Sequence, residues 1–196
     1  MNALRPSRLS KTLALVPPAM ALVAQHANGA FDAFIKLGDN ITGESTEEKH
    51  TGWIELKSVE WNVTRTITAG TSGSLRDVSA PKVSEITLTK DLDRASPAIF
   101  LNAVSSSSST AIPTVTLELT KSTGMETSPG VFYRLTLSNV LVSSQKNTAN
   151  EGDDRPKETI TLNFTKIKVE YWTQDAKGTL TPVTPVTFDF AKGTAS

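Results

Sequence analysis

Apolar and polar residues alternate along most of the chain after residue 30, which is the pattern of β-strands with one buried face. The shorter runs of this kind are Ala33, Ile35 and Leu37; Ile86 and Leu88; Val115, Leu117 and Leu119; and Val186, Phe188 and Phe190. Gly38 and Asp39 predict a turn after the first run. The pattern therefore predicts a mainly β protein.

Three longer runs change the parity of their apolar positions partway along. The changes separate Ile54 and Leu56 from Val59, Trp61 and Val63; Tyr133, Leu135 and Leu137 from Val140 and Val142; and Ile160, Leu162 and Phe164 from Ile167, Val169 and Tyr171. Such a change within one strand is typical of a β-bulge, which bends the strand. Strands that reverse their facing midway favour a curled, two-sheet antiparallel β-barrel over a flat sandwich.

One segment has helical spacing instead. Ser96 is predicted to be the N-cap, and Pro97 follows it at the first helical position. The apolar residues at helical intervals are Ile99, Phe100, Leu101 and Val104, and the run Ser105 to Ser109 would end the helix. We expect one short helix that flanks the barrel, and polar, mobile connections at residues 69–74 and 143–157.

The first 29 residues differ in kind from the rest. Three basic residues within residues 1–11 precede an uncharged apolar run, Thr12 to Ala24, which is too short to span a bilayer as a helix. Small residues at Ala27 to Gly29 place the expected cleavage before Ala30. We therefore expect a signal-peptide-like segment at residues 1–29, a barrel domain at residues 30–196 and no stable membrane anchor. A retained extension and a start codon upstream of the real one are the alternatives.

Composition narrows the possible functions. The chain has 20 Lys and Arg residues against 20 Asp and Glu residues, and it has no basic patch of the kind that holds nucleic acid. It contains no cysteine, which excludes disulfides, cysteine–zinc sites, iron–sulfur clusters and thiol nucleophiles. Its 27 threonines and 20 serines agree with a β-rich fold.

Candidate catalytic chemistry is sparse. His50 lies beside Glu47 and Glu48, which suggests a histidine–carboxylate pair or a metal site, although its loop position favours a solvated surface. Asp153 and Asp154 lack the alternating oxygen ligands of a calcium loop. Neither a phosphate-binding glycine motif nor a nucleophile elbow occurs. The sequence predicts no enzymatic activity, no metal and no cofactor.

The tryptophans divide into two groups. Trp61 shares a face with Val59 and Val63, so we expect it in the core. Trp53 and Trp172 each lie opposite the apolar face of their own strand. We expect both to be exposed, and exposed aromatic side chains of this kind are candidates for a subunit contact.

Several blocks of sequence form a recognisable set. They are Phe34 to Asp39; Gly43 to Ser45 with His50; Trp53 to Leu56; Val59 to Trp61; Thr89 to Asp93 with Ser96 and Pro97; Leu137 to Ser144; and Glu158 to Phe164 with Ile167 and Tyr171. In this order, the blocks resemble the Hcp (haemolysin-coregulated protein) family, the tube proteins of the type VI secretion system. The resemblance implies a β-barrel with one flanking helix and no catalysis. It also implies homohexameric rings that stack into a secreted tube, with small effector proteins in the lumen and with sheath and spike proteins as further partners.

Roles for particular residues follow only on this reading. If the strand face opposite Trp61 lines the tube, Glu60, Asn62 and Thr64 contact cargo. Residues 42–50 and 69–79 are candidates for ring stacking because of their loop positions. Family members begin close to the equivalent of Phe34, so a cleaved leader would favour an alternative. That alternative is an exported stand-alone module that binds a partner or forms rings in the periplasm or outside the cell.

Overall fold

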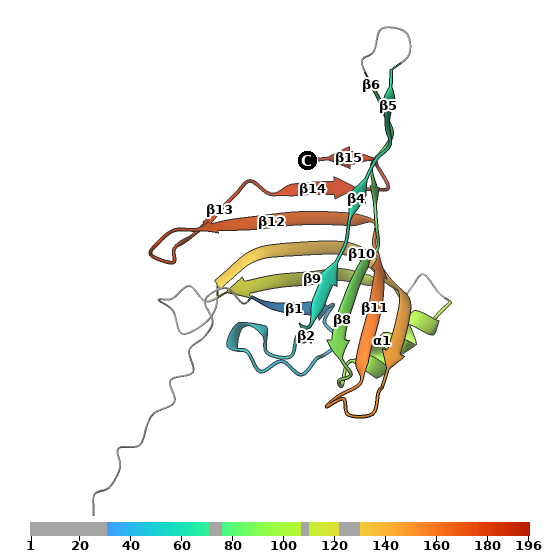
Figure 1. The fold of residues 1–196 in the computed structure, drawn as a ribbon, viewed down its shortest axis with the longest axis vertical. Helices are drawn as coiled ribbons and strands as arrows, with labels where there is room; N and C mark the ends of the chain where they lie inside the picture. Colours follow the sequence, from blue (N-terminus) through green and yellow to red (C-terminus); the bar gives the residue numbers. More distant parts are fainter. Residues whose placement is uncertain (1–30, 71–75, 107–109, 122–129) are drawn as a thin grey trace, which may run out of the picture.

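Two antiparallel sheets that share one long strand form the body of the protein (Figure 1). The computed structural model describes residues 31–70, 76–106, 110–121 and 130–196, so the predicted signal-like segment lies outside the described residues. The shared strand is β10 (Gly130–Thr148), which is 19 residues long. Its first part pairs with β9 and β12, and its second part pairs with β11.

In the described residues, the two sheets together contain 11 strands, with β10 in both. The first sheet contains, in spatial order, β2 (Ile54–Leu56), β1 (Asp32–Leu37), β9 (Ile112–Lys121), β10, β12 (Lys166–Gln174), β14 (Val186–Asp189) and β15 (Thr194–Ala195), with β13 (Leu180–Pro182) paired to β12. The second sheet contains β10, β11 (Lys157–Asn163), β8 (Ile86–Asp91) and β3 (Ser58–Glu60). The runs of alternating residues thus form strands as predicted.

The two sheets curl toward each other at both sides. On one side they share β10, and on the other β2 and β3 are consecutive strands separated only by Lys57. The backbone N–H of Lys57 donates to the Thr89 carbonyl at 2.7 Å, so the chain passes from the edge of one sheet directly to the edge of the other. The predicted curled, two-sheet antiparallel architecture is confirmed, although β2 and β3 do not pair with each other to close the hydrogen-bonded ladder.

Each predicted change of parity coincides with a bend or break. The first is the step at Lys57. In β10 the change falls at Asn139, whose φ of 54° lies in the left-handed region. The third separates β11 from β12, which follow each other along β10. Thr165 lies between these two strands, and its N–H continues their ladder by donating to the Ser138 carbonyl at 3.1 Å.

One core fills the space between the sheets. The largest fully buried apolar side chains are Ile35, Leu37, Ile54, Ile86, Leu88, Ile99, Leu117, Leu135, Leu137, Ile160 and Leu162. They come from both sheets and, through Ile99, from the helix. Trp61 packs against this core as predicted and stacks on Tyr133, with 5.9 Å between ring centroids.

The helix α1 (Ser96–Val104) packs against β10, as predicted, but its start differs. Ala95 occupies the capping position and Ser96 is the first helical residue, so the prediction of Ser96 as N-cap was wrong. The reason is that the Ser96 hydroxyl is buried and donates to Glu158 in β11 at 2.8 Å.

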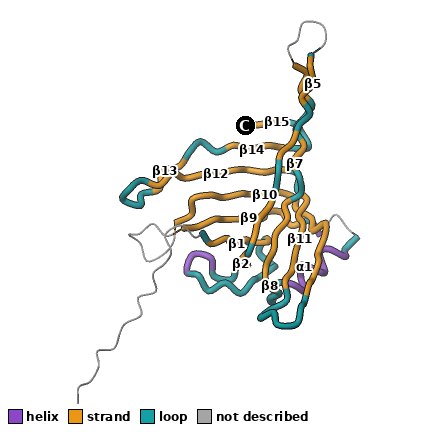
Figure 2. Tube along the Cα trace, in the orientation of Figure 1, coloured by secondary structure: helices purple, strands orange, loops and turns teal. Residues whose placement is uncertain are grey.

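The first part of the predicted loop at residues 143–157 needs correction. Residues 143–148 continue β10 despite their polarity, because β11 pairs with residues 144–148 after a register shift at Ser143. Residues 61–70 and 76–85 form a two-stranded arm, in which β4 (Val63–Thr64) pairs with β7 (Lys82–Val83) and β5 (Ile67–Ala69) pairs with β6 (Arg76–Val78), so Ala69 of the predicted connection lies in a strand. The arm projects from the body beyond the edges of both sheets (Figure 2). The expectation for residues 71–74 lies outside the described residues.

A buried ion pair fixes the helix to the second sheet. Lys90 in β8 is fully buried, and its Nζ lies 2.6 Å from Glu158 Oε2 and 2.7 Å from Asp93 Oδ1. Burial alone would raise the pKa of Glu158, but hydrogen bonds from Lys90, Gln145 and Ser96 outweigh it and lower that pKa. The pair therefore ties the start of α1 to both β8 and β11.

Replacing Lys90 should destabilise the protein strongly. In Lys90→Met, Glu158 stays buried without its cation, and we expect a loss of about 3–5 kcal/mol in the free energy of unfolding, measured with urea. Lys57→Met is the matched control, because this exposed lysine has a surface ion pair with Asp91 at 3.3 Å. Such a pair contributes at most about 1 kcal/mol. Equal losses in the two variants would contradict the role given to Lys90.

The lowered pKa of Glu158 also predicts how this stability depends on pH. A carboxyl group whose pKa is lower in the folded state stabilises the fold above its unfolded pKa, and this contribution disappears as pH falls through the folded value. We therefore expect a smaller loss of stability on acidification in Glu158→Gln than in the unmodified protein.

Candidate assembly surfaces

The loop of residues 42–53 folds back over the first sheet. Its two limbs are joined by backbone hydrogen bonds, from Gly43 to the Gly52 carbonyl at 2.8 Å and from Ser45 to the Trp53 carbonyl at 3.0 Å. The short 3-10 turn η1 (Glu48–His50) lies between the limbs. The loop rests on the face of β1 that points away from the core, where it covers the ring of Phe34.

His50 holds this loop to the sheet from a buried position. Its ring stacks on Phe34 with 4.3 Å between centroids, and it makes a T-shaped contact with Trp53 at 4.8 Å between centroids. Its Nδ1 lies 2.5 Å from Glu47 Oε2, and its Nε2 lies 2.7 Å from Glu118 Oε2 in β9. We call His50, Glu47 and Glu118 the His50 clamp. The expected solvated position of His50 was wrong, because the loop folds inward onto β1 and places this ring against Phe34.

The clamp continues into a row of charges across neighbouring strands. Glu118, Arg134 and Glu170 are opposite one another in β9, β10 and β12. Arg134 Nε lies 2.5 Å from Glu118 Oε1, and Arg134 Nη1 lies 3.9 Å from Glu170 Oε2. Lys168 ends the row with its Nζ 2.7 Å from Glu170 Oε1. Opposite charges on adjacent strands stabilise this part of the sheet.

The two tryptophans proposed for subunit contacts lie at opposite ends of this arrangement. Trp53 is half-buried beside His50, and Trp172 is half-buried under the guanidinium of Arg134, which lies 5.1 Å from its ring. Neither side chain is as exposed as expected. The cause is that His50 and Arg134 each cover one side of a ring.

The three candidate lumen residues lie at the root of the arm. Glu60 ends β3 on the body, Asn62 follows at the junction, and Thr64 belongs to β4 in the arm. All three are exposed. The alternation used to place them ends at Trp61, because Val63 on the opposite face is exposed as well. The structure therefore places only Glu60 on a sheet of the barrel.

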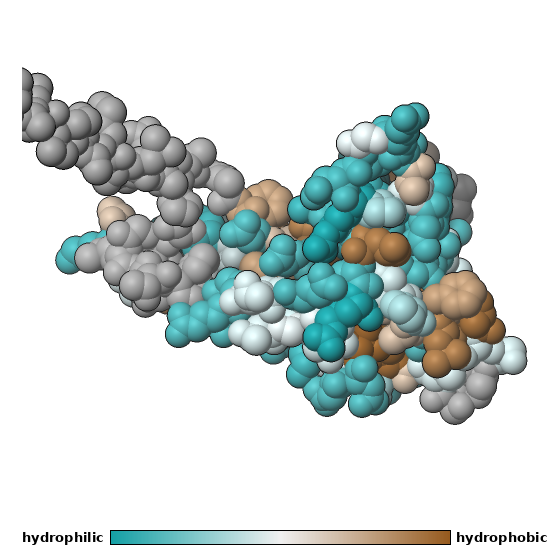
Figure 3. All heavy atoms as spheres, turned by 90° about the horizontal axis from the view of Figure 1, so that it is seen from below, coloured by the Kyte–Doolittle hydropathy of each residue, from teal (hydrophilic) through white to brown (hydrophobic). Residues whose placement is uncertain are grey.

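Apolar side chains are exposed in two places, on helix α1 and on the arm. On α1, three side chains are more than half exposed: Phe100, Leu101 and Val104. Figure 3 shows apolar atoms gathered on the side of the molecule where α1 lies. On the arm, Val63, Ile67 and Val78 are also more than half exposed, and Ile67 and Val78 are cross-strand partners.

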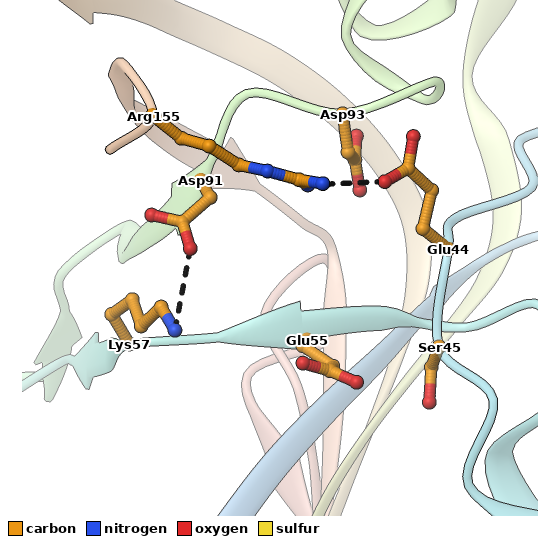
Figure 4. Close-up of a pocket in the computed structure, with 7 residues that line it drawn as sticks. All are labelled: Glu44, Ser45, Glu55, Lys57, Asp91, Asp93 and Arg155. Atoms are coloured by element: carbon orange, nitrogen blue, oxygen red, sulfur yellow. Dashed lines mark hydrogen bonds and ion pairs between the residues drawn. The ribbon is translucent and has the colours of Figure 1, made fainter. Parts of the chain in front are cut away.

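A polar hollow lies between the loop and the second sheet, and it brings four carboxylates together (Figure 4). It is lined by Glu44, Ser45, Glu55, Lys57, Asp91, Asp93 and Arg155. Hydrogen bonds from the Arg94 backbone and from Arg155 lower the pKa of Glu44. Hydrogen bonds from Lys157 and Lys57 lower the pKa of Asp91. A general acid working near neutral pH needs the opposite, upward shift.

Within residues 31–70, 76–106, 110–121 and 130–196, no group of three or more His, Cys, Asp or Glu side chains is placed to hold a metal ion. In the same ranges, no helix is long and apolar enough to cross a membrane.

The fold and its surfaces define a structural β-barrel protein whose buried charges are paired and whose apolar residues remain uncovered on an arm and a helix. Comparison with known proteins identifies the family. A family model described as "Type VI secretion system effector, Hcp" matches residues 34–171. Protein hcp1 of Pseudomonas aeruginosa strain PAO1 is 31% identical over 150 residues, which cover 76% of this chain and 88% of that protein.

Solved structures agree with this assignment. A structure described as a type six secretion system protein has a TM-score of 0.76 and 32% identity, covering 85% of this chain and 100% of its own. Hcp1 from Salmonella typhimurium has a TM-score of 0.67 and 26% identity, covering 85% of this chain and 99% of its own. The chain belongs to the Hcp family of type VI secretion system proteins. Hcp proteins are secreted tube proteins that self-associate into rings and tubes.

Sequence reasoning missed most of the residues that build the loop surface. It singled out His50 and Glu47 but not Glu118 or Arg134, because these residues are far away in sequence. One signal was available: Glu118 lies between Leu117 and Leu119, and Arg134 lies between Tyr133 and Leu135, so each places a charge among the apolar residues of its strand. Two charges of opposite sign on predicted neighbouring strands could have suggested a cross-strand pair.

Gly43→Ala should disturb the loop that carries the clamp. A Cβ at this position would lie 2.2 Å from the Trp53 carbonyl oxygen and 2.7 Å from Ile54 Cγ1, so the two limbs must separate. We expect a loss of about 1–3 kcal/mol in the free energy of unfolding. The exposed neighbour Thr42, as Thr42→Ala, serves as control. Unchanged stability in Gly43→Ala would show that the limbs can separate at little cost.

Proposed function

We propose that the chain forms hexameric rings that stack into the tube of a type VI secretion system, with small effector proteins carried in the lumen. The observation that carries this proposal is the projecting arm with its exposed apolar residues. Val63, Ile67 and Val78 stand away from the barrel core on a narrow two-stranded ribbon. An isolated two-stranded hairpin is marginally stable in water, so contact with another chain would stabilise the arm.

A projecting arm suits repeated, head-to-tail contacts. When one surface of a subunit meets a different surface of the next, copies form a ring if the rotation closes and a stack if it does not. The arm offers one such surface, and the body of a neighbouring copy offers the other. The loop of residues 42–50 is the second stacking candidate, since the His50 clamp holds it in a fixed shape.

Contacts within the ring are assigned to the two tryptophans. Trp53 and Trp172 are half-buried aromatic side chains with one covered and one accessible side. Aromatic residues are enriched at the buried centres of subunit interfaces. The lumen is assigned to the face that bears Glu60, with Asn62 and Thr64 extending this polar surface along the arm.

No catalytic step is part of the proposed function, and the sheath and spike proteins of the secretion system are the further partners. The alternative function is that of an exported, stand-alone ring-forming or binding module. The sequence of residues 1–29 supports this alternative, because a cleaved signal would take the protein out of the cytoplasm, where a tube assembles.

A charge on the arm should impair stacking. In Ile67→Lys, a charge replaces an exposed apolar side chain, and we expect electron microscopy of the purified protein to show rings but few stacks. Thr68→Lys is the matched control, since the adjacent residue points to the other face of the ribbon and has Asp77 as its cross-strand partner. Stacks of undiminished length in Ile67→Lys would contradict the role of the arm.

Native mass spectrometry of the protein from its own host should separate the two functions. The tube function predicts a hexamer whose subunits begin upstream of Ala30, as a retained leader requires. Subunits that begin at Ala30, recovered from the periplasm or the medium, would support the exported module instead.

A further inference from the structure

We propose that the His50 clamp is a proton-dependent latch: it holds residues 42–53 on the first sheet while the His50 ring is protonated and releases them as pH rises. If this loop and the two tryptophans form subunit contacts, as the proposed function holds, assembly weakens over the same range of pH.

The clamp requires two protons on the His50 ring. Both ring nitrogens of His50 contact carboxylate oxygens, at 2.5 Å on Glu47 and 2.7 Å on Glu118. An ionised carboxylate can only accept hydrogen bonds, whereas a neutral imidazole has one N–H and one lone pair. Both contacts are therefore attractive together only when the ring carries two protons. After loss of one proton, one of the two carboxylates faces a lone pair.

The contact between His50 and Glu118 is buried. The His50 side chain is 1% exposed, and that of Glu118 is 8% exposed. Water has little access to relieve a lone pair that faces a carboxylate in such a place, and an unmade contact to a charged group is costly in a low-dielectric interior. The face of the Phe34 ring, stacked on His50, favours the cationic ring further.

The other charged groups around the ring are paired within the first sheet. On β9 and β10, Glu118 keeps Arg134 as a partner through its second oxygen, so its charge stays balanced when His50 is neutral. On β12, Glu170 contacts Arg134 and is also paired with Lys168. Glu47 belongs to the loop itself. Repulsion between Glu118 and a neutral ring is therefore relieved most easily by movement of the loop, which carries His50 and Glu47 together, since Glu118 is held in the sheet.

The clamp also links the two proposed contact residues. Trp53 makes a T-shaped contact with the His50 ring. Arg134 lies over Trp172. His50 and Arg134 each contact one oxygen of Glu118, so this carboxylate connects the two tryptophan sites. Release of the loop would move Trp53 and leave Glu118 to Arg134 alone. Ordering a loop before association lowers the entropy that assembly must overcome, so a held loop favours assembly.

Hydrogen exchange of the full chain, followed by mass spectrometry, tests the latch directly. Exchange of residues 42–53 is compared at about pH 5.5 and about pH 8.5, on either side of the range where histidine commonly titrates, after correction for the intrinsic effect of pH. We expect protection of this loop to fall about tenfold at the higher pH, as the loss of one buried charged contact implies.

Three variants make the test specific. Glu118→Gln places an amide donor opposite His50 Nε2, so a neutral ring can keep both contacts and protection should no longer fall with pH. His50→Gln should give low protection at both pH values. The matched control is Glu48→Gln, an exposed carboxylate in the same turn, which should respond as the unmodified protein does.

The outcomes separate the latch from the assembly role. Loop protection that does not change with pH in the unmodified protein, or that still falls in Glu118→Gln, would overturn the latch. Sedimentation velocity under the same two conditions then reads the oligomer. If the loop opens at high pH while rings persist unchanged, the latch stands and the loop is not a ring contact. If rings and loop protection decrease together, and both persist in Glu118→Gln, the full proposal is supported.

Discussion

The bend in β10 is the constraint on which the rest of the structure depends. This strand pairs with β12 before Asn139, with β9 as far as Val140 and with β11 from Leu141 onward, so one chain segment belongs to both sheets. The left-handed backbone at Asn139 shifts the alternation by one residue. As a result, Leu137 before the bend and Val140 after it both enter the same core. A regular strand would turn one of these two halves outward.

Two buried polar clusters fix the positions of the helix start and of the 42–53 loop, which the apolar core alone does not specify. Lys90 and Glu158 fix the start of α1 to the second sheet, whereas His50 and Glu118 fix a loop to the outer face of the first. Burying charges costs free energy, and such groups are tolerated where every partner is supplied. These clusters therefore fix the start of the helix and the 42–53 loop on the barrel, in addition to the packing of Ile99 in the core.

The same division applies to function. The barrel core is buried within the subunit, while the arm and α1 leave apolar side chains more than half exposed. Membership of the Hcp family agrees with this distribution, because a tube protein acts through contacts between copies. Conversely, the carboxylates of the polar hollow are already engaged by Arg155, Lys57 and Lys157, which fits surface structure better than acid–base chemistry.

Alternation and local motifs in the sequence predicted the β class, the main strands of the two sheets, the three bends and the family resemblance. They did not predict the paired strands of the arm, β13 or β15. The helix was also located, but Ser96 was misassigned and residues 143–148 were taken for a loop, and these roles depend on tertiary contacts. Ser96 and residues 143–148 both take their partners from β11, and His50 meets Glu118 across 68 residues of sequence. Periodicity reports which face of a strand is buried, whereas such contacts depend on how distant strands align and on where a loop folds back.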